Sequence, residues 1–531
     1  MYMRLLKKGM ESIIERYKSR DFFPRINWRL FLGLFLFGFI IHSFRITQMI
    51  NAVDDIFVLL KGYGAGIIRG RWALEYLGNL INWKWQVGSF NLSVFDGTMT
   101  LIFLSLSACI TLELFDLQHG KLGILFAAVF MVYPTCSATF LYMFTAAYYG
   151  FSCFLAVLAA YYIKTQKILY GIFALVCIAI SVGIYQSYFA VTATLCLLIV
   201  IDYFLDQEAD FMAGMKKSIY YVLMLISGLI LYFVVLNNRL KHFGKELDAY
   251  QGVDSMGQIK LQEIPGLIIR CYSSFLRLPV EIYHSINTLE ITQKCILLLF
   301  VFCLVAGVFA VVRHKSLLNR IMLLVLFLLF PIAVNLIEIM CNKGNIYELM
   351  IYSTVFVYLL PILIWKKINV NGNIQQLMHG ASGGVLAVIF VLTVLVYSWH
   401  ANWNYVALDY MNRETMSYYT TLVTRIKSAE GYRDEYPVLF VGAHTFDDEQ
   451  FRNPYSDFPE LYFECNPTDL INTYAWEQAL TAYTGFHHTV PANEESERIY
   501  ASKEYQEMSS YPDDGSIKII DNIIVIKIIS Y

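Results

Sequence analysis

Charged residues are scarce in this chain. Asp, Glu, Lys and Arg together make up 15% of its 531 residues, whereas 57% are hydrophobic. Ordinary soluble domains carry about 25% charged residues. The composition excludes a soluble globule and indicates a polytopic helical membrane protein, with the lipid bilayer as an expected partner. The formal net charge is only −2, so whole-chain charge favours no nucleic-acid partner.

Paired cysteine motifs are also absent. There is no CxxC, and the tail after His400 holds only Cys465, so that tail cannot form an internal disulfide. Most of the ten cysteines stand in apolar runs, where cysteine behaves as a small buried hydrophobe. The pairs Asp447–Asp448 and His487–His488 lack the spacing of metal ligands. We interpret both pairs as solvated loop residues and predict no metal site.

Apolar stretches of membrane-spanning length are what the sequence has in abundance. A helix needs about 20 apolar residues to cross the hydrocarbon core, and that length predicts about eleven transmembrane helices. They are 29–46, 97–115, 121–138, 141–163, 168–186, 188–205, 219–237, 295–313, 321–340, 349–365 and 382–400.

Lysine and arginine are unevenly distributed between the connections. They fall in alternate short loops, at Lys121, Lys164, Lys167, Lys216, Lys217, Arg313, Lys315, Arg320, Lys366 and Lys367. The positive-inside rule assigns these loops to the cytoplasm. We therefore predict a multi-pass protein of the inner (cytoplasmic) membrane, with a basic cytoplasmic N-terminal segment 1–28, an uncleaved first span and an extracytoplasmic C-terminus.

The predicted domain organisation follows from this topology. A transmembrane domain covers 29–400 and presents outer loops 51–95 and 238–294, the second with helices lying in the membrane interface. The tail 401–531 has ordinary charge density and β-type runs at 436–442 and 516–528, the latter two strands joined by a turn at Asp521 and Asn522. We expect a small extracytoplasmic α/β domain.

The first outer loop combines acid and base at a membrane surface. Asp54 and Asp55 follow the first span, and Arg69 and Arg71 come after a glycine-broken run. A carboxylate there can accept a proton from a hydroxyl, and guanidinium groups grip phosphate in a fork geometry. The alternative interpretation is that the aspartates cap a helix and the arginines anchor to lipid headgroups.

Further polar candidates lie inside or beside the spans. Ionisable residues in spans are costly and therefore candidates for function. Asn335 and Glu338 share one helical face near Lys343, Glu348 stands at a span boundary, and the pair Tyr185–Gln186 forms a hairpin tip. The structural alternative for these residues is interhelical hydrogen bonding.

The order of these motifs resembles the GtrII type of membrane glucosyltransferase. The resemblance covers about residues 25–400 and rests on an Asp-Asp loop ending in Gly70–Arg71, the Tyr185–Gln186 hairpin, the NxxE of Asn335 and Glu338, and the run Tyr347–Ser353. It implies a GT-C-like fold and transfer of a sugar, commonly glucose, from a polyprenyl phosphate such as undecaprenyl phosphate. The implied acceptor is a surface glycan such as O-antigen, on the outer face.

The resemblance also implies roles for these residues. Asp54 or Asp55 would take the proton of the acceptor hydroxyl, and Arg71, helped by Arg69 or Lys343, would stabilise the departing lipid phosphate. Tyr185, Gln186, Asn335, Glu338 and Glu348 would line the substrate site. A divalent metal, Mg or Mn, stays open as a cofactor, because arginine alone can neutralise a monophosphate.

Two other functions fit a membrane protein that handles lipid-linked sugar. A transporter or flippase would show two related halves with interrupted spans, and no such repeat is visible in the sequence. A surface-glycan polymerase is the other alternative. The large outer loops favour a transferase that acts on an external acceptor.

Overall fold

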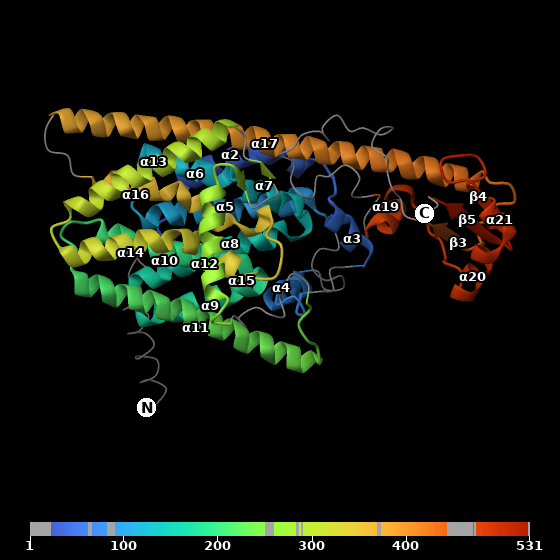
Figure 1. The fold of residues 1–531 in the computed structure, drawn as a ribbon, viewed down its shortest axis with the longest axis horizontal. Coiled ribbons are helices and arrows are strands. Elements are labelled where there is room, and N and C mark those ends of the chain that lie inside the picture. Colours follow the sequence, from blue (N-terminus) through green and yellow to red (C-terminus); the bar gives the residue numbers. More distant parts are fainter. Residues whose placement is uncertain are drawn as a thin grey trace, which may run out of the picture. The chain divides into compact units, whose positions relative to one another are not determined.

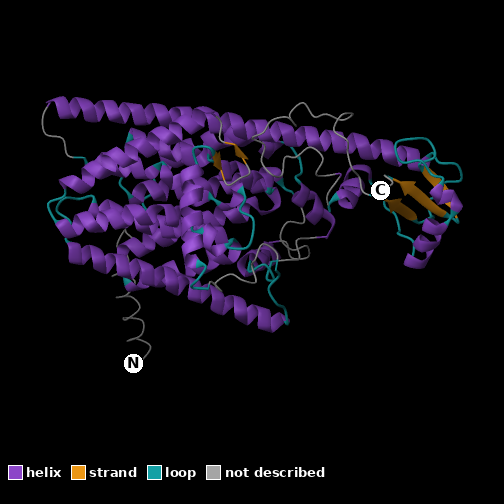
Figure 2. Ribbon diagram, in the orientation of Figure 1, coloured by secondary structure: helices purple, strands orange, loops and turns teal. Residues whose placement is uncertain are grey.

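The computed structural model describes residues 23–61, 66–81, 91–249, 260–282, 286–287, 290–368, 373–442, 471 and 474–528. These residues form two compact units (Figures 1 and 2). Unit 1 contains the described residues within 1–47, 64–87 and 92–402, and unit 2 contains those within 48–63, 88–91 and 403–531. The pair Asp447–Asp448 and Cys465 lie outside the described residues.

Unit 1 is a bundle of helices that crosses a membrane several times. Its long helices are α2 (Trp28–Thr47), α5 (Ser93–Leu114), α8 (Met143–Thr165), α9 (Ile168–Ile184), α10 (Phe189–Phe204), α11 (Phe211–Phe243), α13 (Glu290–Arg313), α14 (Leu317–Val334) and the first part of α17 (Asn373–Lys427). In the centre α5 packs on α8, and α8 packs on both α9 and α10. Outward-facing residues such as Leu304 and Ile230 stay exposed, as expected of lipid-facing positions.

Polar residues at the helix ends explain where several spans begin and stop. The side chains of Asn27 and Asp210 accept backbone N–H groups of Leu30 and Ala213, at 3.2 and 2.6 Å. Such bonds satisfy donors that a first helical turn leaves without a partner. Gly244 ends α11 in the left-handed region, with φ of 59°, a conformation that glycine adopts without steric cost.

The predicted spans are found, but not all as single helices. Within the described residues, nine helices are long and apolar enough to cross a membrane, and α9 is a shorter apolar helix. The prediction of a continuous helix over 349–365 is wrong. This stretch consists of η3 (Glu348–Met350), η4 (Tyr352–Val357) and α16 (Leu359–Lys367), and most of its residues as far as Ile364 are buried. Non-helical backbone is tolerated at membrane depth when protein surrounds it.

Two other predicted spans are interrupted at polar or proline positions. The segment 121–138 divides at Pro134 into α6 (Lys121–Val132) and α7 (Pro134–Leu141). The segment 321–340 divides at Asn335 into α14 and the short α15 (Ile337–Met340). Hydropathy alone does not reveal such breaks, because the side chains on both sides remain apolar.

The basic short loops gather at one end of unit 1, which we call the basic end (residues 115–121, 164–167, 205–217, 313–320 and 366–368). The ammonium group of Lys366 donates to the Phe115 carbonyl at 2.7 Å. Lys367 pairs with Asp206 at 3.4 Å, and Lys315 with Glu208 at 3.6 Å. Loops distant in sequence are therefore tied together, as the lysine and arginine pattern predicts for loops on one side of a membrane.

Two short helices lie outside the main bundle of unit 1. Helix α4 (Trp72–Ile81) packs on α9, and α12 (Ile264–Arg277) packs on α14 and α15. Helix α12 is strongly amphipathic and buries Leu267 and Cys271. It is followed by a minimal antiparallel pair, β1 (Glu281–Ile282) with β2 (Ile286–Asn287).

Unit 2 contains a three-stranded sheet in the order β3–β5–β4. Strand β3 (Val438–Val441) runs parallel to β5 (Ile523–Lys527), and β4 (Ile517–Ile520) runs antiparallel to β5. Both turn residues between β4 and β5, Asp521 and Asn522, have positive φ, as a two-residue type I′ hairpin requires. The strands and the turn predicted in the tail are confirmed. Leu439, Ile499, Met508 and Val525 are among the residues of the core beneath the sheet.

The helices of unit 2 are α3 (Val53–Lys61), the last part of α17, α19 (Trp476–Thr484), α20 (Asn493–Ala501) and α21 (Lys503–Gln506). Helix α19 packs on α3, so the early loop and the tail share one structural unit. A buried network joins them. Asn412 of α17 exchanges two hydrogen bonds with the backbone of Asn51, at 3.0 and 2.8 Å, and accepts one from the Tyr483 hydroxyl.

Candidate active site

A tight turn at 66–71 presents the arginine pair in unit 1. The N–H of Gly70 donates to the Ile67 carbonyl at 2.9 Å, and that of Arg71 donates to the Gly66 carbonyl at 2.7 Å. Gly70 has φ of 73°, which a residue with a side chain adopts only with strain. The Gly-Arg motif is therefore needed for the turn as well as for any chemistry of Arg71.

Three neighbouring elements hold this turn in place. The Gln186 amide donates to the Arg69 carbonyl at 2.7 Å, and the Tyr232 hydroxyl of α11 donates to the Gly70 carbonyl at 2.9 Å. A Cβ added to Gly183 of α9 would lie 2.7 Å from Trp72, so α4 approaches α9 too closely for a larger residue. The early loop and the Tyr185–Gln186 hairpin are thus brought together.

The Arg71 side chain is oriented by two tyrosines. Its Nη1 donates to the Tyr149 hydroxyl at 3.1 Å, and its Cζ lies 4.6 Å from the centre of the Tyr185 ring. The two rings are stacked, with centres 4.5 Å apart. A guanidinium over an aromatic face gains a cation–π attraction and loses freedom to rotate. Arg71 is also half-buried. The two tyrosine contacts hold its planar guanidinium group in one orientation.

The two aspartates occupy the first turn of α3 in unit 2, with different surroundings. Asp55 is buried, and its Oδ2 accepts the backbone N–H of Ala52 at 3.2 Å. This is the helix-capping role expected of an acidic side chain in the first turn. Asp54 is half-buried and accepts a hydrogen bond from the Tyr474 hydroxyl, whose ring packs edge-on against Phe57 at 5.2 Å.

The NxxE motif ties α12 to the rest of unit 1. The Asn335 amide donates to the carbonyls of Cys271 and Pro331, at 3.1 and 3.0 Å. Glu338 is buried, and its Oε2 accepts from Nε and Nη2 of Arg270 at 3.1 and 2.7 Å, while Oε1 accepts from Ser274 at 2.5 Å. The basic partner in these bonds is Arg270, not the Lys343 that the sequence placed nearby.

The link between α15 and η3 carries the remaining predicted residues. Lys343 is exposed on this link, whereas Glu348 is buried at the start of η3, which packs on α7. In the following run, the Tyr352 hydroxyl donates to the Phe130 carbonyl and Ser353 to the Val334 carbonyl, both at 2.7 Å. The motif that carries the resemblance here fills the interior of the bundle.

Several polar residues near these motifs were not predicted. His42 and Arg45 on α2 are both fully buried; His42 bonds to the Met131 carbonyl at 3.0 Å and stacks on Phe140 of α7. Two ionisable residues three positions apart inside a predicted span could have been recognised from the sequence as candidates for function. Tyr149 and Tyr474 gave no signal, because the chain has 38 tyrosines and nothing local distinguishes these two.

The arrangement of unit 1 suits recognition of a phosphate attached to an organic group. The Arg71 fork matches phosphate oxygens, and the neighbouring tyrosine rings offer flat surfaces and hydroxyls. Across the described residues, no group of three or more His, Cys, Asp or Glu side chains is placed to hold a metal ion.

Within the described residues, the number of helices long and apolar enough to cross a membrane defines a polytopic helical membrane protein. The sequence profile of the family described as "Glucosyl transferase GtrII" matches residues 43–364, more than half of the chain. The protein belongs to this glucosyltransferase family. No curated protein matches the chain.

Proposed function

We propose that this glucosyltransferase takes glucose from a polyprenyl phosphate and attaches it to a surface glycan on the outer face of the membrane. Family membership gives the sugar transfer. A lipid-phosphate donor keeps its chain in the bilayer and its phosphate near the surface, so its recognition needs a cation fixed at the end of a membrane bundle. The observation that carries the proposal is the Arg71 guanidinium held by Tyr149 and Tyr185.

The proposed reaction is a single displacement at the anomeric carbon. The acceptor hydroxyl oxygen attacks that carbon and forms the new glycosidic bond, while the bond from carbon to the phosphate oxygen breaks. The electron pair leaves with the polyprenyl phosphate, where Arg71 offsets the developing charge. The hydroxyl proton passes to a carboxylate base.

Of the two aspartates in unit 2, Asp54 has the surroundings that better suit a proton acceptor. Asp55 is buried and uses an oxygen to cap α3, whereas Asp54 is half-buried and is held by a hydroxyl donor. A general base has to reach its substrate, and the more accessible side chain meets that condition.

The Arg71→Lys variant tests the phosphate grip. Lysine keeps the charge but loses the bidentate fork and the flat contact with Tyr185. Hydrogen bonds to charged groups contribute about 1.5–3 kcal/mol, so we expect kcat/KM for the polyprenyl-phosphate-glucose donor to fall about tenfold or more. Sugar release from the purified full-length protein in detergent measures it.

A matched control is Arg277→Lys, on the exposed end of α12, which should leave kcat/KM unchanged. Equal activity of Arg71→Lys and the unaltered protein would refute the phosphate role. Donor binding with no sugar release by the unaltered protein would favour a transporter instead.

A further inference from the structure

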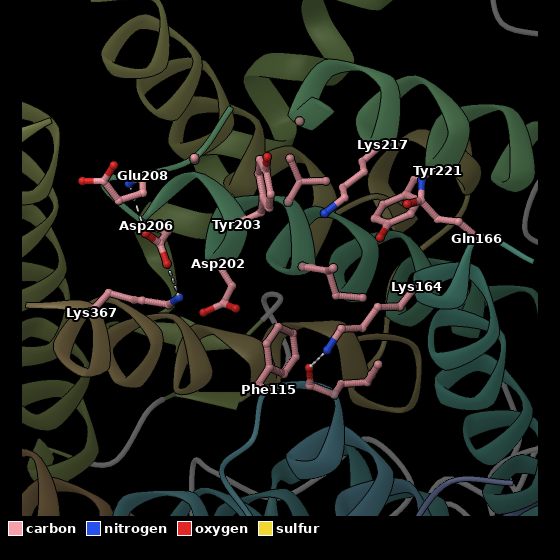
Figure 3. A pocket seen from close by; sticks show the side chains of 15 residues that line it. Phe115, Lys164, Gln166, Asp202, Tyr203, Asp206, Glu208, Lys217, Tyr221 and Lys367 are labelled. Carbon is pink, nitrogen blue, oxygen red and sulfur yellow. Dashed lines mark hydrogen bonds and ion pairs between the residues drawn. The ribbon is translucent and has the colours of Figure 1, made fainter. Parts of the chain in front are cut away.

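A cavity lies at the basic end of unit 1 (Figure 3). It has a volume of about 430 Å³ and is bordered by the ends of α5, α8, α10 and α16 and by the start of α11. Helix α10 extends from the Gln186 hairpin to this cavity through 16 residues, a rise of about 24 Å. The cavity is therefore separated from the Arg71 turn by most of a membrane thickness.

Some of the charges around this cavity are already balanced. Lys367 pairs with Asp206 at 3.4 Å, and Glu208 pairs with Lys315 at 3.6 Å. The backbone N–H of Glu208 and the Lys367 ammonium hold the pKa of Asp206 below its ordinary value, so this pair stays ionised at neutral pH. These ion pairs form one rim of the cavity.

Three other charged groups are directed toward the same space. The carboxylate of Asp202 has a buried oxygen, Oδ1, with no hydrogen-bond partner within the described part of the chain. Lys164 donates to the Leu114 carbonyl, and the Lys217 ammonium lies 4.0 Å from the centre of the Tyr203 ring. Figure 3 shows the Asp202 carboxylate and both ammonium groups facing the cavity. Each ammonium has three N–H donors, so both can also bind an anion.

Part of the cavity wall is apolar, and this part includes residues at the end of α10 and the start of α11. Leu114, Ile199 and Val200 line it together with the buried Tyr221 of α11. The other face of α11 exposes Ile219 and Val222 by more than half, as expected where acyl chains cover a helix. A ligand that enters beside α11 can therefore leave hydrocarbon chains in the bilayer and place its polar group in the cavity.

We propose that this cavity binds the headgroup of an ethanolamine phospholipid, with the phosphate on Lys164 and Lys217 and the primary ammonium on Asp202. The site offers two cations and one carboxylate, whose Oδ1 lacks a hydrogen-bond donor within the described residues. A headgroup with both a phosphate and an N–H-bearing ammonium satisfies all three, because buried charges are stable only when paired and hydrogen-bonded. A choline headgroup has no N–H to donate to Asp202, and a headgroup without an ammonium group likewise leaves Oδ1 of Asp202 without a hydrogen-bond donor.

The test compares lipids bound to the full-length protein. The protein is reconstituted in nanodiscs that contain equal amounts of ethanolamine, choline and glycerol phospholipids, released into the gas phase, and its retained lipids are identified by native mass spectrometry. We expect the ethanolamine phospholipid to be retained about tenfold over the choline one, the effect of one hydrogen bond to a charged group. Retention of choline or glycerol phospholipid to the same or a greater extent would overturn the proposal.

Three variants assign the contacts. Asp202→Asn should abolish the preference for ethanolamine, and Lys217→Gln should reduce retention of every phospholipid. The neighbouring exposed residue gives a matched control, since Lys216→Gln removes a lysine that does not line the cavity and should behave like the unaltered protein. An unchanged preference in Asp202→Asn, or equal effects of the two lysine variants, would refute the assignment.

A soluble headgroup distinguishes the source of the ligand. Phosphoethanolamine without acyl chains should displace the bound lipid only at far higher concentration, because it lacks the hydrocarbon contacts. Displacement at equal concentration would show that the site takes a soluble phosphate ester and would overturn the lipid assignment. The lipid ranking of the unaltered protein tests the proposal even if a variant fails to fold.

Discussion

Asp54 and Asp55 are neighbours in the chain but differ in what their carboxylates do. Asp55 caps α3 through the Ala52 N–H and is buried, whereas Asp54 meets the Tyr474 hydroxyl. The sequence could predict that this acidic pair begins a helix, and it could also predict a catalytic role. It could not distinguish the surroundings of the two carboxylates, because the partner of Asp54, Tyr474, lies 420 residues further along the chain.

The two asparagine variants should therefore fail in different ways. Asp54→Asn removes a proton acceptor, so we expect turnover to fall by about 10²- to 10⁴-fold with donor binding and thermal stability kept. Asp55→Asn weakens a helix cap, which costs about 1 kcal/mol and lowers stability first. Sugar-release kinetics and thermal unfolding of both variants measure this contrast.

The reverse pattern would exchange the two roles. Near-normal turnover in both variants would remove this loop from the catalytic centre. Tyr474→Phe serves as an intermediate case, because it keeps the ring against Phe57 and loses only the hydroxyl that orients Asp54.

Among the elements, α12 shows how a surface helix is fixed to a membrane bundle. The Arg270 side chain is 42% exposed, and its partner Glu338 only 6%. Periodicity predicted helices lying in the membrane interface over 238–294, and NxxE predicted a functional acid. The two features belong to one ion pair, which local sequence cannot show because the partners stand 68 residues apart.

This asymmetry predicts unequal costs for the two halves of the pair. Arg270→Ala leaves a buried carboxylate without a cation and should cost about 3 kcal/mol. Glu338→Ala leaves an arginine that can reach water, and it should cost clearly less. The double variant should resemble Glu338→Ala, and thermal unfolding of the full-length protein in detergent gives the ranking. A larger loss for Glu338→Ala would mean that Glu338 stabilises something besides α12.

The β4–β5 hairpin makes a second prediction at the level of elements. Asn522 has φ of 63°, so Asn522→Gly should keep or slightly raise the stability of the hairpin, whereas Asn522→Val should cost about 1–2 kcal/mol for a branched side chain in the left-handed region. The rate of limited proteolysis of unit 2 in the intact chain follows these changes. Equal rates for the glycine and valine variants would contradict the turn assignment.

For the molecule as a whole, hydropathy predicted the positions of the apolar segments better than their secondary structure. Segments such as 349–365 are apolar whether they form one helix or three short ones, and the buried surroundings that permit the breaks come from distant helices. At α17 the prediction was instead too short. The predicted span covers 382–400, whereas the helix has 55 residues and is about 80 Å long. Composition changes at His400, yet neither Pro nor Gly occurs between Val385 and Glu430, so the helix continues beyond the apolar stretch.

The final prediction concerns the orientation of the chain in the membrane. The basic loops contact one another at one end of unit 1 through Lys366, Lys367 and Lys315, and such an end is retained in the cytoplasm. The apolar stretch 382–400 of α17 follows the last of these loops, and one more crossing takes the chain to the other side. We therefore expect a cytoplasm-active reporter fused after the last residue to be silent, and the same reporter inserted beside Lys315 to be active. An active C-terminal fusion with a silent Lys315 insertion would invert the orientation and place the Arg71 turn on the cytoplasmic side.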